Sequence, residues 1–138
     1  MIDTEQRKLG ASGLVVPALG VGVWSWGDKN IWGYGQVYGH DDVLQAYHAC
    51  LEAGLNFFDT AEMYGSGASE RLLGECRRAE GHPIIASKFA PPLNRFSRKR
   101  SSARSLLDAL DHSLERLGVP CIDLYQIHFP SPLLKVDD

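Results

Sequence analysis

Three ionisable side chains, Asp59, Lys88 and His128, occupy corresponding positions near the ends of three predicted strands. Alternate residues of a strand face opposite sides, so each of the three shares a face with apolar residues earlier in its strand. Against the helices that cover a sheet, such groups would be desolvated without partners, at a cost of several kcal/mol. On the other face, at neighbouring strand ends, they can meet each other. We therefore expect a polar cluster at the carboxyl ends of the strands.

A phenol joins this cluster, because Tyr64 follows Asp59 closely in the segment DTAEMYGSGASE. We expect Asp59 and Lys88 to form a buried ion pair. A cation beside a tyrosine stabilises the tyrosinate and lowers the phenol pKa from about 10, which makes the phenol a proton donor near neutral pH. His128 can donate a hydrogen bond to a carbonyl oxygen or share its proton with Tyr64. The group suits protonation of an oxygen that gains negative charge as hydride arrives at carbon.

The segments that must position these residues alternate between strand and helix. The predicted strands are residues 18–24, 55–59, 83–89 and 121–129, preceded by a hairpin whose turn holds Gly10, Ser12 and Gly13. Three helices with apolar residues at the helical period lie between them. The first starts at Asp41 or Asp42, carries Val43, Tyr47, Cys50 and Leu51, and closes at Gly54. The second is capped by Ser69 and carries Leu72, Leu73 and Cys76. The third starts at Ser101 or Ser102, carries Ala103, Leu106, Leu107, Leu110, Leu114 and Leu117, and stops at Gly118.

This alternation predicts an α/β fold with a parallel sheet and right-handed crossovers. A doubly wound sheet would bind nucleotide through a Gly-rich turn that opens into a helix after the first strand. The segment WSWGDKNIWGYGQVYGH does not have that pattern. A barrel is therefore favoured, but a (β/α)8 barrel takes eight strands and about 250 residues. We expect residues 1–138 to form one domain: the N-terminal half of a TIM barrel, with about four parallel strands, helices outside and an N-terminal β-hairpin, truncated after strand four.

Composition excludes several function classes. The chain has 138 residues with a formal net charge of −3, which gives no electrostatic case for nucleic acid or anionic membranes. No apolar run reaches the length of a membrane span, about 18 residues. The three cysteines are scattered and fit reduced thiols, so we expect a cytoplasmic protein, or a plastid protein if a transit peptide is missing from this chain. No cysteine or histidine pair has metal-ligand spacing, and no metal is expected. One basic cluster is interpreted as a solvated loop or, less simply, as an anion site: Arg95, Arg98, Lys99, Arg100 and Arg104.

Four motifs together resemble the aldo-keto reductase superfamily. They are KLGASGLVVPALGVGVWSWG near the start, GLNFFDTAEMYGSGASE at 54–70, ASKF at 86–89 and DLYQIH at 123–128, in family order and spacing. The segments LGVGVWSWGD and DLYQIHFP look closest to a subgroup found in plants, algae and cyanobacteria. The resemblance implies an NADP-dependent oxidoreductase that reduces a small aldehyde or ketone to an alcohol with NADPH.

The resemblance also implies residue roles. Tyr64 would be the general acid, Lys88 would lower its pKa, Asp59 would hold Lys88 charged and His128 would orient the substrate. Asp59 would also touch the cofactor, together with residues at the end of the first strand. These are Gly22, Val23 and Trp24, although Val23 stands where many relatives carry threonine. Of the loop aromatics, Trp24 is expected in the substrate pocket, whereas the segment GSG at 65–67 is interpreted as a tight turn rather than a phosphate loop.

A second hypothesis is kept. In this family the adenosine and pyrophosphate are held mainly by loops after later strands, which do not occur in these 138 residues. The chain can therefore be a catalytically inactive truncated product, or a half-barrel that works only with a partner chain. Exposed strand edges and an exposed apolar face promote association, so we expect self-association.

Overall fold

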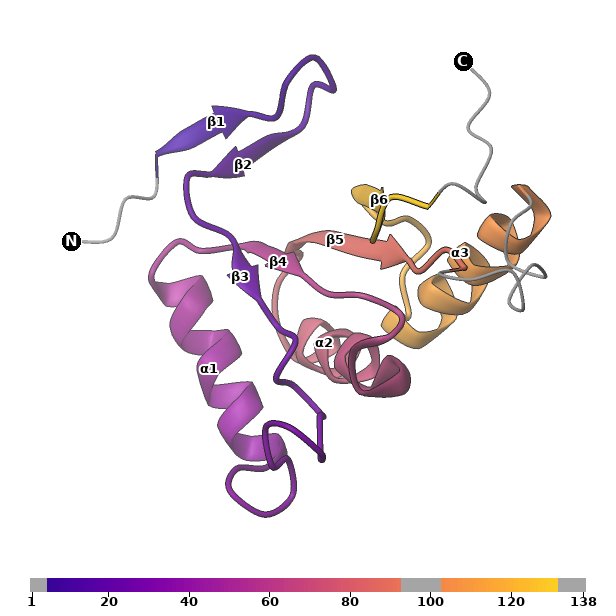
Figure 1. Cartoon of the computed structure of the whole chain (residues 1–138). Coiled ribbons are helices and arrows are strands. Elements are labelled where there is room, and N and C mark those ends of the chain that lie inside the picture. The colour runs from indigo at the N-terminus through magenta and orange to yellow at the C-terminus, as the bar shows by residue number, and fades with distance from the viewer. Residues whose placement is uncertain (1–4, 93–102, 132–138) are drawn as a thin grey trace.

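The structure is a computed structural model that describes residues 5–92 and 103–131. Two short strands, β1 (Gln6–Lys8) and β2 (Val15–Pro17), form an antiparallel hairpin. A separate four-stranded sheet has the order β3-β4-β5-β6, with every neighbouring pair parallel. Three helices lie along one face of this sheet, and the hairpin stands beside it (Figure 1). The predicted α/β half-barrel with an N-terminal hairpin is confirmed.

The four parallel strands are shorter than predicted. They are β3 (Val21–Gly22), β4 (Phe57–Asp59), β5 (Ile84–Phe89) and β6 (Leu124–Ile127). Each strand lies within its predicted range, so the predictions were wrong only about where the strands begin and end. At the start of β4 the reason is local: the Leu55 N–H donates to the Cys50 carbonyl at 2.8 Å and so closes the preceding helix rather than joining the sheet.

Helices α1 (His40–Glu52) and α2 (Ala68–Ala79) occur where predicted, but their starts differ. Gly39 caps α1, and Asp42 accepts a hydrogen bond from the Gly39 N–H at 2.7 Å from within the first turn. Gly67, in a left-handed conformation with φ 84°, caps α2. The predicted cap Ser69 lies inside α2, fully buried. The prediction was wrong because the Ser69 hydroxyl donates a hydrogen bond to the Val23 carbonyl and does not cap α2.

Helix α3 (Ala103–Leu117) keeps part of its predicted apolar stripe, because Leu110, Leu114 and Leu117 lie in or against the core. Leu107 is 53% exposed, whereas Ala109 and Ser113 are buried. Helix α2 approaches α3 so closely that a Cβ at Gly74 would lie 2.5 Å from the Leu117 carbonyl oxygen. The contact therefore requires a residue without a Cβ at position 74. The predicted starts of this helix, Ser101 and Ser102, lie outside the described residues, as does the basic cluster except Arg104.

The core lies between the sheet and its helices. Phe58 of β4 and Ile85 of β5 point into it, almost completely buried, together with Tyr47 of α1. Their strand neighbours Phe57 and Ile84 are only partly buried, because they face the other side of the sheet. Burial of each large apolar side chain contributes about 1.5–3 kcal/mol. The core thus fixes which strand residues point to the open face.

A charged network ties α2 and α3 to β5. The Glu70 carboxylate, fully buried, accepts from Arg116 Nε at 2.5 Å and from Ser87 Oγ at 2.6 Å. A buried carboxylate without such partners would be strongly destabilising. The network therefore anchors β5, the strand that carries Lys88, to both helices.

Candidate active site

Asp59 and Lys88 meet at the carboxyl ends of β4 and β5. The Lys88 ammonium donates to Asp59 Oδ2 at 2.6 Å and to the Thr60 carbonyl at 2.8 Å. The Lys88 side chain is 13% exposed and that of Asp59 is 36% exposed. The pair is therefore shielded on the lysine side and open to solvent on the carboxylate side. An ammonium with two oxygen partners in a partly desolvated place is held firmly in one position.

Tyr64 reaches the same ammonium from the loop after β4. Its hydroxyl lies 3.5 Å from Lys88 Nζ, at the limit of hydrogen bonding, and Nζ lies 5.0 Å from the ring centroid. The tyrosine begins the short helix η1 (Tyr64–Gly67), in which Gly65, Ser66 and Gly67 all have positive φ. This confirms a tight turn at GSG. The turn reverses the chain so that the phenol points back over the strand ends.

His128 completes the group from the end of β6. Its backbone N–H donates to the Phe89 carbonyl at 2.8 Å, which extends the β5–β6 ladder by one bond. The imidazole lies edge-on to the Tyr64 ring at 5.5 Å and stacks on Phe129 at 4.2 Å. Burial, and then the charge of Lys88, lower the pKa of His128 below its usual value. Both effects favour the neutral imidazole, and its buried Nδ1 has no hydrogen-bond partner among the described residues.

These side chains border an apolar pocket of about 240 Å³. Its walls are Trp24, Met63, Tyr64, His128 and Phe129. The Trp24 ring is 46% exposed and lies 6.1 Å from that of Tyr64. The cavity can thus take a small, largely apolar molecule. The Tyr64 hydroxyl and the His128 imidazole are the polar groups that it offers to that molecule. The loop aromatics Trp26, Tyr34 and Tyr38 do not line it.

The four residues expected at the cofactor are adjacent but face different ways. Gly22 pairs with Asp59 across β3 and β4, and no atom would lie within 4 Å of a Cβ built on Gly22. Trp24 is half-exposed at the pocket. Val23, in contrast, points its side chain into the core, fully buried. Its N–H donates to the Asp59 carbonyl at 3.0 Å and its carbonyl accepts from Ser69 Oγ at 2.7 Å.

Comparison with known proteins decides the family. A profile described as the Aldo/keto reductase family matches residues 18–138. The chain belongs to this family. The match includes the strand ends and the turn that carry Asp59, Tyr64, Lys88 and His128.

Individual relatives are longer than this aldo/keto reductase chain. A pyridoxal reductase of Arabidopsis thaliana chloroplasts is 33% identical, over 89% of this chain and 35% of that protein. A 6-dehydroglucose reductase of Novosphingobium aromaticivorans is 39% identical, over 92% of this chain and 42% of that protein. A crystal structure of an aldo-keto reductase from Klebsiella pneumoniae, in complex with NADPH, superposes with a TM-score of 0.68 at 27% identity. The superposition covers 86% of this chain and 37% of that protein. The chain therefore spans less than half the length of these relatives.

Four residues at the site of this aldo/keto reductase were not found by sequence reasoning. Thr60 and Ser69, both fully buried, share a hydrogen bond between their hydroxyls at 2.8 Å and so join the start of α2 to β4. Met63 and Phe129 line the pocket. A signal existed for Met63 and Phe129, because each adjoins a predicted catalytic residue. Thr60 gave none, because its contact with Lys88 uses a backbone carbonyl.

The described residues contain neither a metal-binding cluster nor a membrane-spanning helix. Within residues 5–92 and 103–131, no three His, Cys, Asp or Glu side chains come together as a metal site would require. In the same residues, no helix combines the length and apolar character of a membrane span.

Proposed function

We propose that the chain contributes the catalytic half of an NADPH-dependent reductase of small aldehydes or ketones. One observation carries this proposal: a single ammonium, that of Lys88, stands between the Asp59 carboxylate at 2.6 Å and the Tyr64 hydroxyl at 3.5 Å. A hydroxyl beside a fixed positive charge can give up its proton, because that charge stabilises the phenolate left behind. Tyr64 is then the general acid and Lys88 its electrostatic partner.

His128 fits the role of orienting group. The neutral imidazole carries one proton, and Nδ1 is buried without a partner among the described residues. We place the proton on Nε2, which leaves Nδ1 as an acceptor and lets Nε2–H donate to a substrate oxygen. That oxygen would then lie between the imidazole and the Tyr64 hydroxyl. Two donors directed at one oxygen stabilise the negative charge that develops on it during reduction.

The open side of the sheet fits the nicotinamide end of a dinucleotide. The space above Gly22 is free, and Asp59 and the half-exposed Trp24 border it. The buried Val23 side chain would not touch the cofactor, and its backbone hydrogen bonds would hold the neighbouring residues in place. When bound, NADPH supplies the hydride that the carbonyl carbon accepts. The NADPH complex of the Klebsiella pneumoniae relative supports this choice of cofactor.

The test combines binding and turnover by the 138-residue chain. NADPH is titrated while the fluorescence of Trp24, Trp26 and Trp32 is followed, and reduction of a simple aldehyde is measured by loss of NADPH absorbance. Tyr64→Phe should abolish reduction and leave NADPH affinity within about twofold, because only the transferred proton is lost. Tyr34→Phe is the matched control, since it removes a loop phenol outside the pocket. Equal loss of binding and turnover in Tyr64→Phe would make Tyr64 a structural residue.

A second candidate is a half-barrel that is inactive until another chain completes it. The open sheet favours it, because β3 and β6 are the outer strands of the sheet and the Asp59 carboxylate remains partly exposed. If this candidate is correct, NADPH does not quench the tryptophan fluorescence of the isolated chain, and the chain does not reduce an aldehyde. The same fluorescence titration therefore separates the two candidates.

A further inference from the structure

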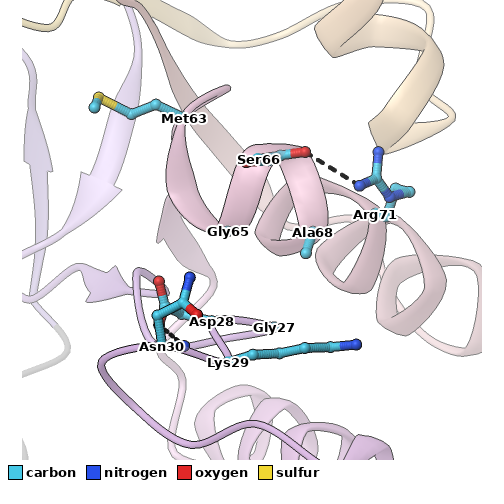
Figure 2. Close-up of a pocket in the computed structure, with 9 residues that line it drawn as sticks. All are labelled: Gly27, Asp28, Lys29, Asn30, Met63, Gly65, Ser66, Ala68 and Arg71. Carbon is cyan, nitrogen blue, oxygen red and sulfur yellow. Dashed lines mark hydrogen bonds between the residues drawn. The ribbon is translucent and has the colours of Figure 1, made fainter.

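A second cavity adjoins the candidate active site. It is a cleft of about 480 Å³ between the loop after β3, which carries Gly27 to Asn30, and the turn from Met63 to the start of α2. In Figure 2 Lys29 comes from the loop wall and Arg71 from the α2 wall. None of the four residues assigned to catalysis lines this cleft. It is therefore a feature that the proposed reduction does not use.

Close backbone contacts build the back of the cleft. A Cβ at Gly27 would lie 2.6 Å from the Ala68 Cβ, and one at Gly65 would lie 3.1 Å from the Gly27 carbonyl oxygen. On the loop side, Asp28 Oδ1 accepts from the backbone N–H of Asn30 at 3.0 Å and of Ile31 at 2.7 Å. These contacts hold the two walls at a fixed separation.

The charge of the cleft is positive. Arg71 donates to the Ser66 carbonyl at 3.2 Å, and no carboxylate of the described residues lies within 4.0 Å of the Arg71 or Lys29 nitrogens. Asp28 is the one acidic residue in the lining, and it is 8% exposed. Backbone hydrogen bonds, chiefly that from Ile31, keep the pKa of Asp28 below its usual value. Asp28 therefore stays ionised and its charge is solvated by the N–H groups of its own loop, while Lys29 and Arg71 leave the lining with a net positive charge.

The cleft and the active-site pocket share one wall. Met63 lines both cavities, and Tyr64 and His128 line the smaller one. The Met63 side chain is half-exposed, and its displacement would join the two cavities, so that a molecule whose carbonyl group lies at Tyr64 would extend into the cleft. The first part of such a molecule would meet apolar walls and its far end would meet two cations.

We propose that the cleft binds an acidic group of the substrate, so that the preferred substrates are carbonyl compounds with a carboxylate or phosphate at the far end. This inference rests on the proposed function for the position of the carbonyl. Lys29 and Arg71 are its specificity residues. Lysine and arginine provide charge-assisted hydrogen bonds, which are the strong ones for carboxylates and phosphates.

The test uses straight-chain aldehydes of increasing length that end in a carboxylate, each compared with its methyl ester. Binding to the 138-residue chain is followed by NMR, through the Met63 methyl group and the backbone amides of Lys29 and Ser66. Reduction with NADPH is measured in parallel. Acids of sufficient length should shift all three signals and bind about tenfold more tightly than their esters.

Variants assign the effect. Lys29→Gln combined with Arg71→Gln should remove the preference for the acid and leave binding and reduction of the ester unchanged. Arg78→Gln is the matched control, because it removes an exposed arginine of the same helix that does not line the cleft. Equal binding of acid and ester by the unaltered chain, or a preference that survives the double substitution, overturns the proposal.

Failure of the reductase proposal gives a different result. If neither acid nor ester is reduced but the acid still shifts the Lys29 and Ser66 amides, the anion cleft stands and the assigned chemistry at Tyr64 fails. If the ester is reduced and no acid perturbs these amides, the reductase assignment stands and the cleft is not a substrate subsite. The two proposals are thus tested separately.

Discussion

The Asp59 carboxylate and the Lys88 ammonium lie 2.6 Å apart although they come from different strands. The register of the sheet explains the contact. Asp59 is paired with Ala86, and Lys88 follows two residues later on the same face of β5. Its long side chain reaches back over the end of β4, where the Thr60 carbonyl accepts a second hydrogen bond at 2.8 Å. The ion pair is thus a consequence of strand pairing.

Replacement of Lys88 by methionine should separate charge from shape. Lys88→Met keeps the side-chain length but leaves Asp59 without its cation and Tyr64 without its electrostatic partner. We expect loss of aldehyde reduction by about 10²-fold or more, with the pH profile of the remaining activity displaced. The profile of kcat/KM against pH is the measurement. Residual activity with an unchanged profile would contradict coupling between Lys88 and Tyr64.

The His128 imidazole should titrate below the ordinary histidine value of about 6.5. Burial is the main cause and the Lys88 charge the second, and both favour the neutral ring. The linked contribution to stability is fully present above pH 6.5 and is lost as the pH falls through the lowered pKa of the folded state. NMR titration of the ring signals measures it, with the urea-unfolded chain as control. In Lys88→Met the pKa should rise part of the way back, and an identical value in both chains would exclude the charge effect.

Much of the site could be predicted from the sequence because strand parity is a local property. The alternation in residues 55–59 and 83–89 assigns Asp59 and Lys88 to one face, and the parallel order then brings them together. The starts of the helices could not be predicted in this way. Gly39 and Gly67 cap α1 and α2 through backbone conformation, whereas a serine such as Ser69 is the usual cap residue.

Tertiary contacts account for the other differences. Ser69 turns inward to the Val23 carbonyl, a contact between residues far apart in sequence. The close approach of Gly74 to Leu117 also joins residues far apart in sequence, and the apolar pattern within α3 does not record it. The anion cleft is likewise invisible in the sequence, since Lys29 and Arg71 belong to segments that only the folded chain brings together.

Substitution by alanine should affect the stability of the chain very differently at two glycines, Gly74 and Gly22. At Gly74 the new Cβ would lie 2.5 Å from the Leu117 carbonyl oxygen, so Gly74→Ala should lower the free energy of unfolding by about 1–3 kcal/mol. At Gly22 the space is open, and Gly22→Ala should change that free energy by less than about 0.5 kcal/mol. If NADPH passes over Gly22, the same methyl group should weaken NADPH binding about tenfold. Urea unfolding and fluorescence titration measure the two effects, and unchanged NADPH affinity would remove Gly22 from the cofactor site.

The outer strands of the sheet should cause the chain to self-associate. Among the described residues no strand lies beyond β3 or β6, and strand edges of this kind pair readily with other chains. Ile127 of β6 is 42% exposed, so Ile127→Lys places a charge at that edge and should shift the chain toward monomer in sedimentation velocity. Val37→Lys is the matched control, since Val37 is 82% exposed in a loop away from the sheet. A monodisperse monomer with a cooperative melt in the unaltered chain would show that the open sheet is stable alone and would contradict association through its edges.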